Sequence, residues 1–176
     1  LEFRRVLFRS PVSNITMDRR KDLRDFSTVV KTGLYVVNFQ KFDMKKDEFV
    51  LDLVVWFDFN SDEIMLDLID KFSFKNGNIK YKSQGDLRME GNRVFVKYNV
   101  QLDVKSQFNY HRFPTGDHAL SIVLINEHVT PEEMFFLTQG NSLVVSDDAF
   151  LYDAGWAIHN MHVDSRSEEH TSELQS

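Results

Sequence analysis

The chain has 176 residues, of which 21 are lysine or arginine and 27 are aspartate or glutamate, so its formal net charge at pH 7 is −6. It contains no cysteine, which excludes disulfides and thiolate metal sites. A mildly acidic chain lacks the basic surface that nucleic-acid binding requires, and no apolar run approaches the roughly 20 residues that span a bilayer. Sixteen phenylalanines among alternating Val, Leu and Ile favour β structure with one domain-sized core.

The two ends of the chain resemble sequencing-library adapters translated in frame. The matching stretches are Leu1–Ser10, LEFRRVLFRS, and Arg166–Ser176, RSEEHTSELQS. We therefore leave residues 1–10 and 166–176 out of the fold prediction, as one would an expression scar. The alternative is a basic amphipathic arm at one end and an acidic tail at the other. On the adapter interpretation we expect the protein-derived part, 11–165, to be an incomplete piece of a longer protein.

The beginning of this part predicts a lead-in followed by two strands. Residues 11–28 are charge-rich with a short apolar stripe, which predicts a helical lead-in to the domain at 29–165. Val29–Phe42 predicts a strand, with Gly33 as the place of a β-bulge. In Phe49–Phe59 every second residue is apolar, and an alternation this long predicts a half-buried strand.

The middle of the chain predicts a hairpin and a second long strand. Phe72–Phe74 and Ile79–Tyr81 flank the sequence Asn76-Gly77-Asn78, a turn signal that predicts pairing between the two flanks. Glu90-Gly91-Asn92 then leads into Arg93–Val104, where apolar and polar residues alternate again. By contrast, the connection between Phe59 and Phe72 is acidic and irregular.

The stretch Phe108–Asn126 combines a stiff loop with an apolar strand. Pro114 restricts its own φ and the residue before it, and Gly116 permits backbone conformations that other residues avoid. Ala119–Ile125 is apolar on both faces apart from Ser121, which predicts a strand buried inside a sandwich.

The last part of the chain predicts one short helix and two more strands. Thr130–Glu133, TPEE, has the residues of a helix start with a capping box. Leu143–Val145 predicts a brief strand, and Gly155–Asn160 begins a last one. Many short strands at regular spacing, with almost no helix, predict an all-β fold of the β-sandwich type.

The order of these features resembles a known family. A long β-meander, an aromatic-Pro turn, an apolar strand, a Glu-Glu-Met-Phe-Phe run and a Gly-Trp-x-Ile sequence follow one another. This order is similar to that in the extracellular ligand-binding domain of pentameric ligand-gated ion channels, the Cys-loop receptor superfamily, in its cysteine-free prokaryotic-type branch. Thr32–Phe39 resembles the family's first strand, Phe49–Phe59 its second, and Phe113-Pro114 with Leu120-x-Ile122 the loop that names the superfamily. The resemblance covers about 30–160 and implies an immunoglobulin-like β-sandwich of the neurotransmitter-gated channel type, truncated at its C-terminal end.

The resemblance implies a function in the cell membrane. Five copies of such a domain surround one axis on the periplasmic or extracellular side, above membrane helices that this chain does not contain. A small ligand binds between neighbouring copies and shifts a closed–open equilibrium, because it binds one arrangement better. The loop around Phe113-Pro114 would couple binding to gating; the residues that the resemblance assigns to it are Tyr110, Arg112, Phe113, Pro114 and Asp117. Alternatively, Pro114 only closes a corner of the sandwich.

Three aromatic residues are candidates for contact with the ligand: Trp56, Tyr35 and Phe95. Trp56 lies on the polar face of the predicted strand 49–59, and the resemblance implies that this strand contributes a side chain to the pocket between subunits. Phe95 is the one apolar residue on the polar face of the next long strand. Aromatic faces hold cationic ligands by about 0.5–2 kcal/mol each. The alternative is that Trp56 packs under a neighbouring loop.

The acidic connection offers a speculative calcium site, made of Asp58, Asp62, Glu63, Asp67 and Asp70. It begins like an EF-hand loop, but Glu63 replaces the required glycine and Ile69 stands where the bidentate glutamate should be, so we reject an EF-hand. The alternative is a solvated acidic edge. The chain has no nucleophile-elbow, P-loop or dinucleotide-binding motif, so we expect neither an enzyme nor a cofactor.

Two other functions stay open at this point. Thr115 and Gly116 stand where the family has an aromatic residue and an aspartate. A module outside a channel need not preserve gating contacts, so the chain could be a periplasmic sensor of the same fold on a one-helix signalling protein. The third alternative is an unrelated β-sandwich, such as a carbohydrate-binding or adhesion module. Its mark would be a flat aromatic platform on one sheet.

Overall fold

The computed structural model describes residues 4–8, 28–43, 46–105, 118–119, 121–130, 133–139, 141–149 and 156–161, and every structural statement below concerns these residues. Strands make up most of them, and the one helix among them, α2 (Leu66–Ile69), has four residues. No helix in this described part is long and apolar enough to cross a membrane. The prediction of an all-β fold is therefore confirmed at the level of class.

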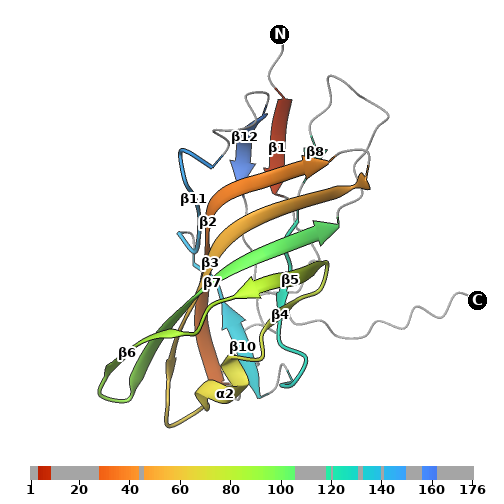
Figure 1. The fold of residues 1–176 in the computed structure, drawn as a ribbon. Helices are drawn as coiled ribbons and strands as arrows, with labels where there is room; N and C mark the ends of the chain where they lie inside the picture. The colour runs from red at the N-terminus through yellow and green to blue at the C-terminus, as the bar shows by residue number, and fades with distance from the viewer. Residues whose placement is uncertain are drawn as a thin grey trace, which may run out of the picture.

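Three long strands form the centre of the largest sheet. β2 (Thr28–Asp43), β3 (Glu48–Asn60) and β7 (Arg93–Lys105) lie side by side and pair antiparallel in the order β2-β3-β7 (Figure 1). The predicted strands 29–42, 49–59 and 93–104 are thus confirmed within a residue or two. Long ladders form here because β-branched and aromatic residues recur at every second position, where they pack on one face of the pleat.

Four shorter strands complete this sheet at its two sides. β5 (Gly77–Lys82) and β6 (Asp86–Glu90) pair one after the other with β7 in antiparallel orientation. On the opposite side, β10 (Met134–Leu137) and β11 (Leu143–Val145) pair with β2 in parallel. The sheet is therefore mixed, and the predicted brief strand at 143–145 is confirmed.

The core lies on one face of β3 and β7, which we call the inner face. Along β3 the odd-numbered residues from Phe49 to Phe59 are buried and the even-numbered ones are half-buried. Along β7 the even-numbered residues from Val94 to Val104 are buried. Each large apolar side chain removed from water in this way contributes about 1.5–3 kcal/mol. The alternation read from the sequence thus identified the core face of both strands.

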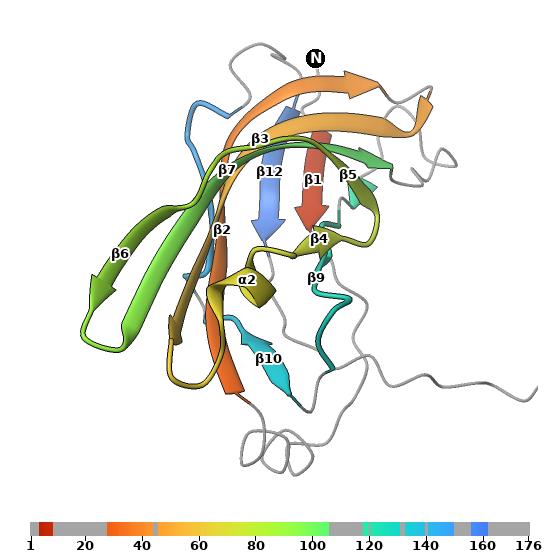
Figure 2. The ribbon, with the colours of Figure 1, turned by 60° about the horizontal axis from the view of Figure 1, so that its bottom comes forward.

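The large sheet curves over a layer of short segments that cover its inner face (Figure 2). This layer contains α2, β4 (Ser73–Phe74) and β9 (Leu124–Ile125), and β4 pairs antiparallel with β9. Ile69 and Phe72 reach the core from this layer, and Met134 reaches it from β10 at the side of the large sheet. The arrangement is sandwich-like, with one long sheet and one layer of short, irregular pieces.

A second, three-stranded sheet contains β1 (Arg4–Phe8), which pairs in parallel with both β12 (Trp156–Met161) and β8 (His118–Ala119). β12 confirms the predicted last strand. β1 falls inside the stretch that we left out of the fold prediction because of its resemblance to an adapter. Its Val-Leu-Phe run has high strand propensity whatever its origin, so leaving it out missed a strand.

The predicted hairpin around Asn76 is wrong. β4 pairs with β9 and β5 pairs with β7, so the two flanks do not pair with each other. The Asn76 side chain donates to the carbonyl oxygen of Ser121 at 2.6 Å and accepts from the backbone N–H of Val123 at 3.3 Å. The asparagine therefore connects the turn to a distant segment, a role that a local turn signal does not reveal.

The predicted bulge at Gly33 is also wrong. The register between β2 and β3 shifts between Val36 and Asn38 and again between Phe39 and Lys41, whereas Gly33 pairs regularly with Trp56. Glycine is needed at position 33 for a different reason: the space that a side chain would fill there is occupied by the indole of Trp56 and the carbonyl oxygen of Ser142.

Two predictions in the last third are corrected as well. Ala119–Ile125 is not a continuous buried strand: β8 and β9 have two residues each, and the side chains from Ser121 to Ile125 are half-buried. Half of the capping box at Thr130 forms: the Glu133 carboxylate accepts from the Thr130 backbone N–H at 2.9 Å, but the Thr130 hydroxyl donates to that carboxylate instead of accepting from the Glu133 N–H. However, strand β10 follows instead of a helix, because Met134–Leu137 pairs with β2.

Candidate ligand-binding surface

The outer face of the β3–β7 ladder, which is turned away from the core, carries two of the three predicted ligand contacts. In the register of the ladder Trp56 lies opposite Lys97, and Asp58 lies opposite Phe95. Trp56 and Phe95 are therefore diagonal neighbours on the same face. Their ring centroids are 5.9 Å apart and their planes differ by 25°, which is a stacked arrangement. Both side chains are half-buried, so part of each stays accessible.

A glycine creates the space that the indole occupies. Gly33 on β2 pairs with Trp56, and a Cβ atom added to it would lie 2.5 Å from Cε2 and Cζ2 of the indole. The same Cβ would lie 2.5 Å from the carbonyl oxygen of Ser142, which bounds this space from another side. The benzene part of the indole therefore lies directly over the backbone of β2. Thr32 also connects β2 to β3 at this point, because its hydroxyl donates to the carbonyl oxygen of Trp56 at 2.9 Å.

Tyr35 lies on β2 near this pair but outside the stack. It pairs with Val54 and Val144, and 38% of its surface is exposed. Because Gly33 and Tyr35 are two residues apart on one strand, they share the outer face. We call Trp56, Phe95, Tyr35 and Gly33 together the outer patch. The sequence reasoning identified its three aromatic members, but missed the glycine that makes room for them.

The charged groups beside the stacked pair form ion pairs with each other. Arg93 Nε donates to Asp58 Oδ1 at 2.7 Å, and its Nη2 donates to the other oxygen of the same carboxylate. This fork raises the pKa of Arg93, chiefly through the hydrogen bond to Asp58. Lys97 Nζ lies 3.0 Å from Asp86 Oδ2. The immediate surroundings of Trp56 and Phe95 are therefore close to neutral.

The five carboxylates of the speculative calcium site do not come together. Asp58 is held by Arg93, Asp62 accepts from the amide of Asn92, and Glu63 accepts from the amide of Asn60 at 3.0 Å. Across the described part of the chain, no three His, Cys, Asp or Glu side chains are grouped so that they could hold a metal ion. The acidic stretch is a set of separate polar contacts.

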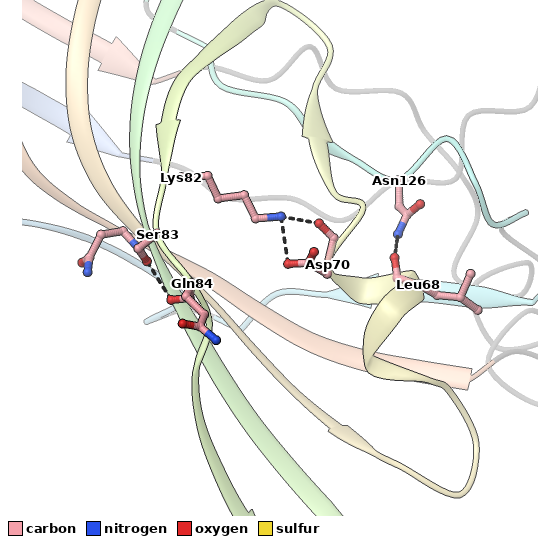
Figure 3. Close-up of polar contacts among 7 residues, drawn as sticks. Leu68, Asp70, Lys82, Ser83, Gln84 and Asn126 are labelled. Atoms are coloured by element: carbon pink, nitrogen blue, oxygen red, sulfur yellow. Dashed lines mark hydrogen bonds and ion pairs between the residues drawn. The ribbon is translucent and has the colours of Figure 1, made fainter.

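The fifth of these carboxylates, Asp70, belongs to a cluster that sequence reasoning missed. Lys82 Nζ lies 2.9 Å from Asp70 Oδ1 and also donates to the backbone carbonyl of the same residue (Figure 3). The ammonium group lies 4.3 Å from the centroid of the Phe72 ring and 4.8 Å from that of Tyr98. A cation between a carboxylate and two aromatic faces is stabilised by both. Nothing in the local sequence indicates this, because its members come from the segment that directly follows α2, from β5 and from β7.

The same cluster changes the acidity of a phenol. Burial raises the pKa of Tyr98 well above its ordinary value, and the negative charge and hydrogen bond of Asp70 raise it further. Tyr98 is buried on the inner face, next to Phe57 and Phe72. Beside the cluster, the Asn126 amide donates to the carbonyl oxygen of Leu68 at 2.7 Å (Figure 3). These contacts hold the short helix α2 against the sheet and make the cluster structural.

The predicted coupling loop, with Tyr110, Arg112, Phe113, Pro114 and Asp117, lies outside the described residues. So does the predicted helical lead-in at 11–28, except for Thr28, which begins strand β2. The chain matches no protein-family model, and no curated protein matches its sequence significantly.

Proposed function

We propose that this chain is a binding domain that takes a small organic ligand on the outer patch. The observation that carries the proposal is the stacked pair of Trp56 and Phe95 on the half-buried outer face of the sheet, with Trp56 over Gly33. Aromatic residues in this position have not been used to fill the core, which has its own cluster on the inner face. Half-exposed aromatic faces with polar neighbours are a typical setting for ligand recognition.

At a finer level, we propose that the domain is the extracellular or periplasmic part of a pentameric ligand-gated ion channel. Its support is the order of sequence features, together with an outward aromatic residue on the second long strand. In this proposal the fold is the immunoglobulin-like sandwich of that family, the assembly is a homo-pentamer, and the ligand binds where neighbouring copies meet. The membrane helices would follow in the complete protein, and the loop around Phe113-Pro114 would couple binding to gating.

Calorimetric titration of the chain with small ligands tests the binding proposal. The panel contains an organic cation, tetramethylammonium, and neutral sugars, such as methyl glucoside and short oligosaccharides. We expect one class to bind, and we expect Trp56→Ala to abolish that binding. Tyr81→Ala is the matched control, because Tyr81 is an exposed aromatic residue of the same sheet that lies opposite Gln101, away from the stacked pair. Binding that survives Trp56→Ala, or the absence of binding by the whole panel, would contradict the proposal.

The channel proposal has a separate test, which is recovery of the gene beyond Asp164 by long-read sequencing of its source. Four apolar helices after the domain would support a channel and justify measuring currents. One helix followed by a signalling domain would instead support the sensor alternative, and it would leave the binding proposal intact.

A second candidate function is a carbohydrate-binding module, which one observation favours. The charged groups beside Trp56 and Phe95 are paired with each other, in Arg93–Asp58 and Lys97–Asp86, so the patch offers no free carboxylate to a cation. A neutral, hydroxyl-rich ring suits such a surface better than an organic cation does. In the titration, binding of sugars without binding of tetramethylammonium would support this candidate over the channel.

A further inference from the structure

Strand β6, Asp86–Glu90, forms part of a free edge of the large sheet. It pairs with β7 on one side only, and no described strand pairs with its other side. Along a strand, every second residue directs its backbone N–H and C=O groups to the same side, so half of the backbone groups of β6 face this edge. Together with β7, the strand projects from the body of the molecule (Figures 1 and 2). Nothing in the described part of the chain covers it.

Two apolar side chains are exposed on this strand. All five residues of β6 are exposed, and Leu87 and Met89 keep 42% and 63% of their surface in contact with solvent. They lie opposite Val96 and Val94, two buried residues of β7, so they extend the apolar inner face beyond the part that the molecule itself covers. An edge strand with uncovered apolar residues is a template for pairing with another chain.

The charges of β6 fit a second copy of the same strand. Arg88 and Glu90 lie on the outer face, where Arg88 lies opposite Phe95. Glu90 lies opposite Arg93, whose guanidinium forms its ion pair with Asp58 and feels the charge of Glu90 only as a weaker electrostatic contribution. If two copies of β6 pair antiparallel with Met89 opposite Met89, then Arg88 of each copy lies opposite Glu90 of the other. Each of these two cross-strand pairs then brings opposite charges together, which stabilises the pairing of neighbouring strands. The arrangement is symmetric, as an interface with a two-fold axis requires.

The same register also fits the apolar residues and the length of the hairpin. Leu87 of one copy lies opposite Gly91 of the other and diagonal to its Met89, so the four apolar side chains form one strip. Gly91 belongs to the turn after β6, with φ of +60°. The turn of one copy thus reaches only the beginning of β6 in the other, and neither hairpin runs into the body of its partner.

We propose that two copies of this chain associate through β6, which makes one continuous sheet of both large sheets. The proposal goes beyond the binding function, because the free edge and the outer patch are separate features. The two-fold contact through β6 is also distinct from the head-to-tail contacts that would close the pentamer of the channel proposal. The shift by one pair to Leu87 opposite Leu87 is less favourable, since it would use Asp86, whose carboxylate is already 3.0 Å from Lys97 Nζ.

Sedimentation velocity of the full chain over a range of concentrations tests the proposal. We expect a concentration-dependent species of twice the monomer mass of 20.7 kDa. Met89→Lys should abolish this species, whereas Met65→Lys should leave it, because Met65 is equally exposed, at 67%, but lies away from the edge. A chain that stays monomeric at all concentrations would overturn the proposal, and so would an oligomer that survives Met89→Lys.

A charge exchange tests the register itself. Arg88→Glu places like charges opposite each other twice in each dimer, and Glu90→Arg does the same. Each single variant should weaken association about tenfold or more. The double variant Arg88→Glu with Glu90→Arg should restore association to near the original value. Failure of the double variant to recover, while circular dichroism shows that it is folded, would contradict the register.

Discussion

The two faces of the β3–β7 ladder both carry aromatic side chains, but they differ in how deeply these are packed. On the inner face, Phe57 contacts Phe72, Tyr98 and Phe136 with centroid distances of 5.1, 6.2 and 5.5 Å. On the outer face, Trp56 has one aromatic partner among the described residues, Phe95, at 5.9 Å. The residues of each face alternate along the same two strands, so the difference comes from what covers each face.

The two faces of this one ladder are expected to have different roles: the inner face stabilises the fold, and the outer face binds the ligand. The inner cluster is covered by α2, β4 and β9, and removal of any of its rings would leave a cavity. The outer pair is covered only in part, so its removal would expose a sheet surface that solvent can fill. We therefore expect substitutions on the inner face to change the free energy of unfolding. Substitutions on the outer face should mainly change ligand binding.

The largest expected effect is that of Phe57→Ala on the inner face. A fully buried phenylalanine replaced by alanine loses about 3–5 kcal/mol of stability. The equivalent outer substitution, Trp56→Ala, should cost less, about 1–2 kcal/mol, because the half-buried indole loses its stacking contribution of about 0.5–1.5 kcal/mol and only part of the apolar area of a fully buried side chain. Urea unfolding followed by circular dichroism measures both. If Phe57→Ala does not fold, Phe57→Leu tests the same position with a smaller loss of stability. Equal costs on the two faces would remove the basis of the comparison.

Gly33→Val should have the next largest effect, although it adds atoms to the outer face. A branched side chain at Gly33 would collide with the indole of Trp56 and the Ser142 carbonyl, and overpacking of this kind costs about 1–3 kcal/mol. We also expect the tryptophan emission spectrum to shift, because the indole must move. Gly91→Val is not a suitable control, since Gly91 has a positive φ. Gly33→Ala, with its single methyl group, should give a smaller shift of the same sign. An unchanged spectrum would mean that the indole does not lie over Gly33.

Tyr98→Phe sharpens the comparison through pH. The folded-state pKa of Tyr98 is raised above the unfolded value, so its stabilisation is present below about pH 10 and is lost as the pH rises from there. We expect the stability of the original chain to fall above pH 10 more steeply than that of Tyr98→Phe. At neutral pH the variant should lose about 1 kcal/mol, because Asp70 loses a hydrogen bond. Parallel pH dependences for both proteins would show that the phenol is not held neutral by its surroundings.

The smallest expected effect is that of an exposed titrating group, Glu133. Hydrogen bonds from the backbone and side chain of Thr130 lower the pKa of the Glu133 carboxylate. A lowered pKa contributes stability above the unfolded value of about 4.5, which is lost as the pH falls below it. Glu133→Gln should therefore flatten the acid side of the stability profile slightly and leave the alkaline side unchanged. A larger effect than that of Tyr98→Phe would contradict the view that burial decides these magnitudes.

The long strands could be predicted from the sequence because their signal is local. Period-two alternation in Phe49–Phe59 and Arg93–Val104 identifies both the strand and its core face, and it placed Trp56 and Phe95 on the outer face. The short pieces could not be predicted in this way. Asn76 reads as a hairpin turn, yet its side chain bonds to Ser121 and Val123, 45 and 47 residues away.

The candidate site likewise contains residues that the sequence identifies and residues that it does not. The aromatic members of the outer patch stand out because apolar residues on a polar face break the pattern. Gly33 does not, because its role depends on Trp56 in the neighbouring strand. The cluster of Lys82 and Asp70 is hidden for the same reason. Carboxylates that are close in sequence, such as Asp58 and Asp62, suggested a calcium site, although the turn of the chain directs them to different partners.

The most direct test of the central claim, that the outer patch binds a ligand, is the fluorescence of Trp56 alone. The chain has two tryptophans, so Trp156→Phe leaves Trp56 as the only one. We expect its emission to change on titration with the ligand class that binds in calorimetry, with the same concentration dependence, and we expect Phe95→Leu to shift that dependence to higher concentrations. A ligand that binds in calorimetry without any change in Trp56 emission would show that the site lies elsewhere and would contradict the account.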